Sequence, residues 1–131
     1  MASQQSRVRE EKKTILVVED EEPLQEIVRL KLEREGFNVL TADTGEEAVR
    51  LIKERKPTLI WLDILLPGMD GLEVLQKIRE DPAMRDLPVV MVSVSYSRSK
   101  LQQALALNVV DYIVKSEHRL DDIIKRVKEY L

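Results

Sequence analysis

The feature that most constrains the fold is the alternation of short apolar runs with stretches of helical periodicity. Thr14 to Val18 form a continuous β-prone run, and apolar residues then recur at helical spacing from Leu24 to Leu32. A continuous apolar run is typical of a parallel strand that is covered on both faces. Pro23 suits the first turn of the helix, and Gly36 suits its end. The chain therefore begins with a buried strand followed by an amphipathic helix.

The same strand–helix unit recurs along the chain. The sequence predicts further strands at 37–41, 58–62, 87–93 and 109–114. It predicts helices after the capping-box pattern at 44–47, after the helix start at 70–73, between 97 and 107, and from 120 to 131. Strands that alternate with helices form a parallel sheet with helices on both faces. We therefore predict a (βα)₅ fold over residues 14–131: a doubly wound, five-stranded parallel sheet of the flavodoxin-like α/β class, in a single domain.

The composition limits the chemistry that the chain can carry. It has no cysteine and one histidine, His118, so disulfides, thiolate catalysis and Cys- or His-rich metal clusters are excluded. Carboxylate oxygen is the metal ligand that remains, and it suits Mg²⁺ or Ca²⁺. A net charge of −3 does not indicate a nucleic-acid-binding surface. No apolar run approaches the ~20 residues of a membrane span. We expect a cytoplasmic protein with a flexible N-terminal tail over residues 1–13, no nucleic-acid partner and no membrane contact.

Polar side chains follow four of the five predicted strands. In open parallel sheets, ligands bind beyond the carboxyl ends of the strands, where the strand order reverses. The residues at these ends are Glu19 and Asp20, Asp63, Ser93 and Lys115. Three clustered carboxylates repel one another, and a divalent cation removes that repulsion. A carboxylate can attack phosphorus, while Mg²⁺, an ammonium and a hydroxyl orient the phosphoryl oxygens. The pattern therefore indicates phosphoryl transfer.

Four segments resemble the receiver domain of two-component response regulators, the CheY-like family. They are ILVVEDE at 15–21, LDILLPGMDG at 62–71, PVVMVS at 88–93 and DYIVK at 111–115. The resemblance extends from Thr14 to Leu131, and the segments come in the family's order on the expected strand ends. It implies a phosphoacceptor domain of a two-component phosphorelay that uses Mg²⁺.

The resemblance also implies a role for each acidic residue. Asp63 would accept the phosphoryl group from a histidine kinase or a phosphotransfer protein. Asp20, Asp63 and the backbone carbonyl of Leu65 would bind Mg²⁺, and Glu19 would contact the ion directly or through water. The alternative for the acidic run at 19–22 is a solvated acidic cap at a helix start, which the helix dipole would favour.

Three further residues would sense the phosphoryl group. Ser93 would hydrogen-bond a phosphoryl oxygen, Lys115 would pair with Asp63 and then with the phosphate, and Tyr112 would swing inward as Ser93 moves. The alternative for Tyr112 is ordinary half-buried packing. The surface of the fourth helix, fifth strand and fifth helix would change shape, which would signal to a downstream effector protein or support a homodimer.

The sequence departs from the family pattern near the site. Val94 follows Ser93 where the family usually has Ala or Gly, and its branched side chain would restrict access, as would Leu65. Ser116 replaces the proline that commonly follows the lysine. A non-proline cis bond costs about 2.5–4 kcal/mol, which argues against the cis peptide that is usual there.

Three other functions fit parts of the pattern. One is a scaffold module with the same fold that does not depend on phosphorylation, and Val94 and Ser116 favour it. Another is an aspartate-nucleophile phosphatase, but the position of its general acid is Leu65 here. A nucleotide-binding flavodoxin-like protein would need a Gly-rich loop after the first strand. We expect the chain to catalyse only its own phosphotransfer and autodephosphorylation, and not to be an enzyme in any other sense. We also expect output through a partner protein, unless the chain is a fragment of a longer one.

Overall fold

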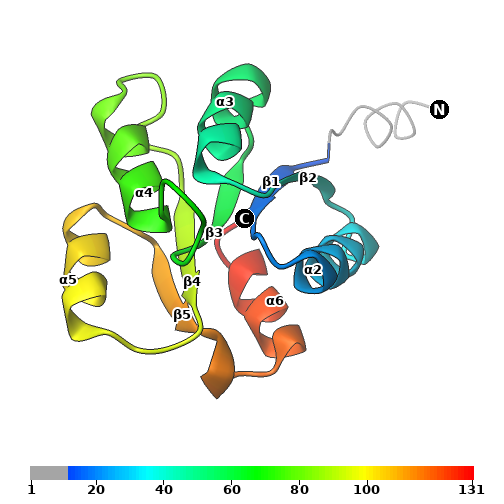
Figure 1. Cartoon of the computed structure of the whole chain (residues 1–131). Coiled ribbons are helices and arrows are strands. Elements are labelled where there is room, and N and C mark those ends of the chain that lie inside the picture. Colours follow the sequence, from blue (N-terminus) through cyan, green and yellow to red (C-terminus); the bar gives the residue numbers. More distant parts are fainter. Residues whose placement is uncertain (1–11) are drawn as a thin grey trace.

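The computed structural model describes residues 12–131 (Figure 1). The predicted tail at 1–13 therefore lies almost entirely outside the described residues. The elements in chain order are β1 (Thr14–Val18), α2 (Glu22–Arg34), β2 (Asn38–Ala42), α3 (Gly45–Arg55), β3 (Leu59–Asp63), α4 (Gly71–Glu80), β4 (Val89–Ser93), α5 (Arg98–Ala106), β5 (Asp111–Val114), the short 3₁₀ helix η1 (Lys115–Glu117) and α6 (Leu120–Lys128).

The five strands form one parallel sheet in the order β2-β1-β3-β4-β5. The strand order reverses beside β1, because β2 lies on one side of it and β3 on the other. In the β1–β3 register, Val18 lies opposite Leu62. The residues that follow Val18 and Leu62, which are Glu19 and Asp63, therefore leave the sheet at the same edge. The predicted fold class is confirmed, and the strand order reverses at the edge where Glu19 and Asp63 lie.

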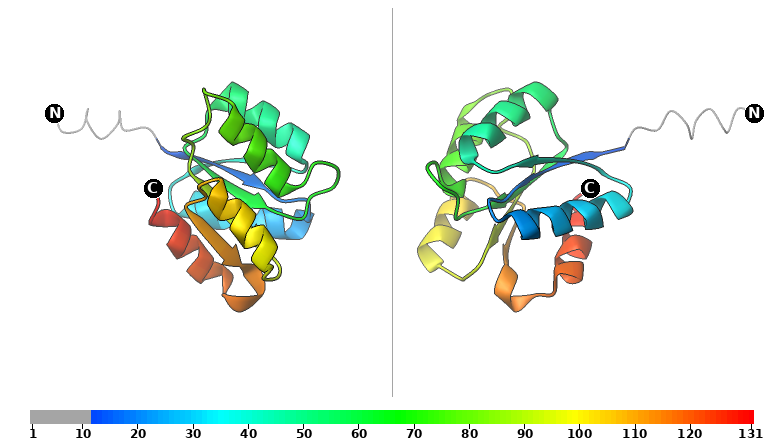
Figure 2. Two further views of the ribbon diagram at one scale, coloured as in Figure 1. Left: turned by 90° about the vertical axis from the view of Figure 1, so that its left-hand side faces the viewer. Right: turned by 45° about the vertical axis from the view of Figure 1, so that its right-hand side comes forward.

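Helices cover both faces of the sheet (Figure 2). On one face, α2 and α6 pack through Val28, Leu32 and Ile124 onto strand residues that include Trp61. On the other face, α3, α4 and α5 pack onto the alternate strand residues, such as Leu62. Every residue of β3 and β4 is buried, which explains why these strands read as continuous apolar runs. Trp61 is a buried core residue.

Several element boundaries differ from the predicted ones. The strand predicted at 87–93 begins at Val89, directly after Pro88, which has no N–H for a sheet. The strands predicted at 37–41 and 109–114 begin at Asn38 and Asp111, the strand predicted at 58–62 runs Leu59–Asp63, and the last helix ends at Lys128. The η1 turn was not predicted.

The two predicted helix starts differ in their caps. At α3, the Thr44 side chain accepts a hydrogen bond from the Glu47 N–H at 3.1 Å, but the Glu47 carboxylate accepts from the Asp43 N–H instead of from Thr44. At α4, Asp70 and Glu73 form a complete reciprocal capping box. The α3 prediction was therefore right about the cap residue and wrong about the reciprocal bond.

The start of α4 lies directly against the end of β3. The Gly71 N–H donates to the Ile64 carbonyl at 2.8 Å. A Cβ atom at Gly71 would lie 2.2 Å from the carbonyl oxygen of Asp63, so only glycine fits at this place. This contact fixes the backbone on which the Asp63 carboxylate stands. Among the helices of residues 12–131, none is long and apolar enough to cross a membrane.

Candidate functional site

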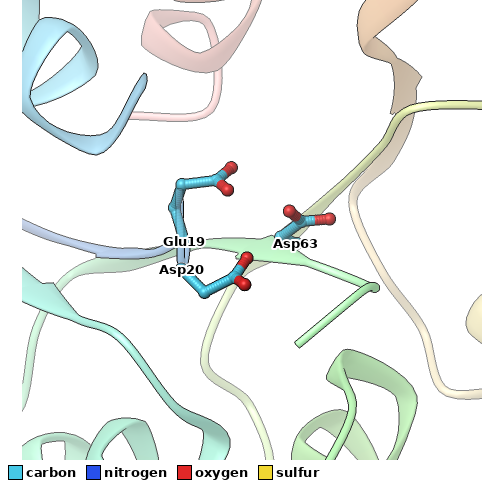
Figure 3. Close-up of side chains that lie close together, drawn as sticks. All are labelled: Glu19, Asp20 and Asp63. Carbon is cyan, nitrogen blue, oxygen red and sulfur yellow. The ribbon is translucent and has the colours of Figure 1, made fainter. Parts of the chain in front are cut away.

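Three carboxylates meet at the carboxyl edge of the sheet (Figure 3). Glu19 and Asp20 follow β1, and Asp63 is the last residue of the neighbouring β3. One oxygen of each side chain lies within 4.8 Å of the others. Glu19 is 1% exposed and Asp63 is 3% exposed, while Asp20 is at the surface. The sheet topology therefore brings together the three acidic residues that the sequence singled out.

The ammonium of Lys115 completes this group. Lys115 is the first residue after β5, and its Nζ lies 3.0 Å from Glu19 Oε1 and 3.2 Å from Asp63 Oδ2. Its side chain is only 14% exposed. One ammonium facing three carboxylates leaves an excess of negative charge in a mostly buried place. Lys115 thus lies where the sequence predicted it.

Backbone N–H groups orient the two buried carboxylates. The Glu21 N–H donates to Glu19 Oε2 at 3.2 Å, and the Leu65 N–H donates to Asp63 Oδ1 at 3.2 Å. Each carboxylate therefore accepts one bond from the backbone and one from Lys115. Both are held in a defined direction before any ligand binds.

The excess negative charge alters the titration of the site. Burial and the nearby charge of Asp63 raise the pKa of Glu19, and the Lys115 ammonium only partly offsets this. Burial opposes the charged form of Lys115, but the charges of Asp63 and Glu19 outweigh it and raise the lysine pKa. Both shifts have the direction expected for a site with too few positive charges. A hard divalent cation fits this set of oxygen ligands, because it supplies the missing charge.

Ser93 and Tyr112 lie beside the site without joining the carboxylates. Ser93 is buried at the end of β4, and its hydroxyl donates to the Ser95 carbonyl at 3.0 Å. Tyr112 packs against the apolar cluster under α3–α5, and its hydroxyl is buried with no hydrogen-bond partner among residues 12–131. The Tyr112 ring is therefore partly buried in this structure.

The two residues expected to restrict access, Leu65 and Val94, are both exposed. Leu65 is 51% exposed and Val94 is 46% exposed, and each lies within two residues of a buried polar residue of the site. The peptide bond between Lys115 and Ser116 is trans, because the described residues contain no cis peptide bond. The expectation drawn from Ser116 is therefore confirmed. His118 is exposed.

Sequence reasoning missed Gln25 on α2. Its Nε2 donates to the Glu19 carbonyl at 2.8 Å, to Asp43 Oδ1 at 2.8 Å and to the Ala42 carbonyl at 3.3 Å. The sequence contains a signal for this role, because Gln25 lies between Leu24 and Val28, two apolar residues of the helix. A polar residue at the border of the buried face of a helix often has a specific partner.

The chain matches known proteins along most of its length. The family model described as response regulator receiver domain matches residues 15–128. The phosphate regulon transcriptional regulatory protein PhoB of Rhizobium meliloti is 39% identical over 117 residues, which are 89% of this chain and 51% of that protein. The chain spans about half the length of the curated relatives it matches.

Two solved structures extend this likeness to three dimensions. The phosphorylated cyanobacterial phytochrome response regulator RcpA is 31% identical, with a TM-score of 0.81 over 92% of this chain and 91% of that chain. The Mn²⁺-bound form of response regulator Rcp1 is 30% identical, with a TM-score of 0.76 over 89% of this chain and 90% of that chain.

Proposed function

Because this chain belongs to the response regulator receiver domain family, we propose that it is a phosphoacceptor switch phosphorylated on Asp63 by a histidine kinase or a phosphotransfer protein. One observation carries the proposal. The Asp63 carboxylate is 3% exposed, bound by Lys115 at 3.2 Å and clustered within 4.8 Å of two other carboxylates. The solved structure of the relative RcpA is that of a phosphorylated protein.

The proposed reaction uses an Asp63 oxygen as the nucleophile. A bond forms between this oxygen and the phosphorus of a phosphohistidine, the phosphorus–nitrogen bond breaks, and its electron pair returns to the imidazole of the donor. Lys115 stays beside the phosphorylated carboxylate and faces the new phosphoryl oxygens. Water later attacks the phosphorus, the bond between the phosphorus and the Asp63 oxygen breaks, and inorganic phosphate leaves while the Asp63 carboxylate is regenerated. The chain thus catalyses only its own phosphorylation and dephosphorylation.

We assign Mg²⁺ binding to Asp20, Asp63 and the backbone carbonyl of Leu65, with Glu19 in contact directly or through water. The three clustered carboxylates and the single ammonium support this assignment. The relative Rcp1 binds Mn²⁺, an ion with the same preference for oxygen ligands. When bound, the ion would neutralise the like charges and stabilise negative charge on the phosphoryl oxygens.

The switch that we propose begins at Ser93. Its hydroxyl now donates to Ser95, so it must leave that partner before it can reach a phosphoryl oxygen. Tyr112 lies on the adjacent strand β5, and its unpartnered hydroxyl can take a new position at little cost in hydrogen bonds. The α5–β5–α6 surface exposes Leu105 and Val110. We propose this surface for the effector protein or for a homodimer.

The decisive experiment is phosphorylation with a small donor. The purified chain is incubated with Mg²⁺ and acetyl phosphate, and its intact mass is measured beside Asp63→Asn and a sample treated with EDTA. A gain of one phosphoryl group in the wild type alone is the expected result. Failure to label, together with no change in the Tyr112 NMR signals on addition of beryllofluoride, would contradict the proposal. The scaffold function would then be the better account.

A further inference from the structure

The side-chain amide of Gln25 joins three chain segments that meet beside the acidic site. Gln25 lies in the first turns of α2, and its Nε2 reaches the Glu19 carbonyl after β1. The same nitrogen reaches the Ala42 carbonyl at the end of β2 and the Asp43 carboxylate beyond it. The amide has two hydrogens and three acceptors, and the two bonds of 2.8 Å are the shorter ones.

The Glu19 backbone is restrained from both sides by this arrangement. Its N–H donates to the Ala42 carbonyl at 3.1 Å, and its carbonyl accepts from Gln25. Regular strand pairing ends at Val18. Beyond Val18, the Gln25 amide donates to the Glu19 carbonyl the hydrogen bond that a neighbouring strand would supply in a regular sheet.

The Glu19 carbonyl belongs to the peptide unit that joins Glu19 to Asp20. Fixing this unit restricts the backbone dihedral angles of both acidic residues, and with them the directions of both carboxylates. The Glu21 N–H bond to Glu19 Oε2 depends on the same local backbone. An outer group that orients ligands in this way commonly changes metal affinity by about 10–100-fold when it is lost.

We propose that Gln25 is a positioning residue for the metal site, acting through the backbone of Glu19 and Asp20. The inference rests on the proposed function, because it assumes that these carboxylates bind Mg²⁺. The function of Gln25 is to keep the two ligands in place before the ion arrives. Gln25 itself does not contact the ion or the phosphoryl group.

Two variants test this role. Gln25→Met keeps the length of the side chain and removes the donors. Gln25→Glu keeps the shape but places a carboxylate against two carbonyl oxygens and Asp43. By charge alone, an added carboxylate near the site would strengthen Mg²⁺ binding, whereas loss of positioning weakens it. The matched control is Gln76→Met on α4, where Gln76 donates to Glu80 on the same exposed helix face.

The primary measurement is the Mg²⁺ dissociation constant by calorimetric titration. We expect both Gln25 variants to bind Mg²⁺ about tenfold more weakly than the wild type, with Gln76→Met unchanged. In the metal-free protein, the Glu19 and Glu21 amides should exchange hydrogen faster in Gln25→Met. At saturating Mg²⁺, phosphorylation by acetyl phosphate should return close to the wild-type rate, because every ligand is still present. A merely structural role would instead leave the defect at saturating Mg²⁺.

Wild-type Mg²⁺ affinity in Gln25→Met, or tighter binding in Gln25→Glu, would overturn the inference. The same follows if Gln76→Met weakens binding equally, since the effect would then not come from the site. If the wild-type chain itself does not bind Mg²⁺, the proposed metal role fails as well. That result distinguishes failure of the proposed function from failure of the Gln25 inference.

Discussion

Lys115 Nζ lies 3.0 Å from Glu19 Oε1, although 96 positions separate the two residues in sequence. Lys115 follows β5 and Glu19 follows β1, and two strands, β3 and β4, lie between these in the sheet. The ion pair therefore spans the carboxyl edge above β3, where Asp63 stands. It places a single positive charge within reach of two buried carboxylates.

Replacing Lys115 by Met should lower the stability of the metal-free protein and strengthen its binding of Mg²⁺. The variant leaves two buried carboxylates without a cation, which should lower the free energy of unfolding of the metal-free protein by about 1–3 kcal/mol. Mg²⁺ should bind it more tightly than the wild type, because the site becomes more negative. Phosphorylation should nevertheless be slower. Urea unfolding with and without Mg²⁺ measures the first two effects, and mass spectrometry measures the third.

Lys128→Met is the control for this change, because Lys128 pairs with Glu35 on the exposed surface. It should leave Mg²⁺ affinity and labelling unchanged. Weaker Mg²⁺ binding in Lys115→Met would mean that the lysine helps to hold the ligands, contrary to the charge argument.

The raised pKa of Glu19 predicts two opposite pH dependences. Burial and the charge of Asp63 raise this pKa from 4.5, so above pH 4.5 the folded metal-free protein holds more protons at position 19 than the unfolded chain does. Its free energy of unfolding should therefore fall as pH rises from 4.5 through the raised pKa. Mg²⁺ affinity should increase over the same interval, because the ion competes with the proton. Chemical unfolding and calorimetry across this interval measure both.

Glu19→Gln serves as the test of that assignment. With no ionisable group at position 19, both slopes should become flatter. If the slopes keep their wild-type size in Glu19→Gln, another group is responsible for them.

The unpartnered hydroxyl of Tyr112 predicts that Tyr112→Phe is tolerated. A buried hydroxyl without a partner costs free energy, so its removal should stabilise the metal-free protein by about 1 kcal/mol. Tyr130→Phe should have the opposite effect, because the Tyr130 hydroxyl donates to Asp111 at 2.8 Å. Urea unfolding of the two variants checks the difference in sign. A clear loss of stability in Tyr112→Phe would show that its hydroxyl has a partner.

The position of Val94 next to Ser93 predicts that a smaller residue at position 94 speeds up phosphorylation. The Val94 side chain is 46% exposed beside Ser93, and Val94→Ala should open the way to Asp63. We expect labelling by acetyl phosphate about two- to fivefold faster, which corresponds to less than about 1 kcal/mol of barrier. Leu105→Ala, on the exposed face of α5, is a control that should label at the wild-type rate. Equal rates in Val94→Ala and the wild type would remove Val94 as a determinant of access.

The close packing of Gly71 against the Asp63 backbone predicts that a larger residue at position 71 destabilises the protein. A methyl group there would overlap the Asp63 carbonyl oxygen, so Gly71→Ala should destabilise the protein by about 3 kcal/mol, near the upper end for overpacking. Gly36→Ala has free space for the methyl group but a φ of +99°, so it should cost only about 1–2 kcal/mol. Thermal unfolding compares the two. A Gly71→Ala variant as stable as Gly36→Ala would show that α4 can move away from β3.

The sequence alone predicted the fold class, the strand positions and the members of the acidic group. These predictions were possible because they depend on local patterns. A strand buried on both faces must be apolar throughout, and the residue that ends it lies at the sheet edge where ligands bind. Asp63, Glu19, Asp20 and Lys115 were therefore named from their positions at strand ends, and the structure brings all four together.

Only the tertiary structure decided which of these groups touch. Lys115 could have paired with Asp63 alone, but the parallel order β1-β3-β4-β5 brings its ammonium to both Asp63 and Glu19. The bond from Gln25 to Glu19 and the bond from Ser93 to Ser95 depend on side-chain rotamers and loop paths that have no periodic signature. The steric limit at Gly71 arises where α4 returns against β3. Periodicity determines which face of an element is buried, whereas hydrogen-bond partners are selected only when distant segments have packed to their final distances.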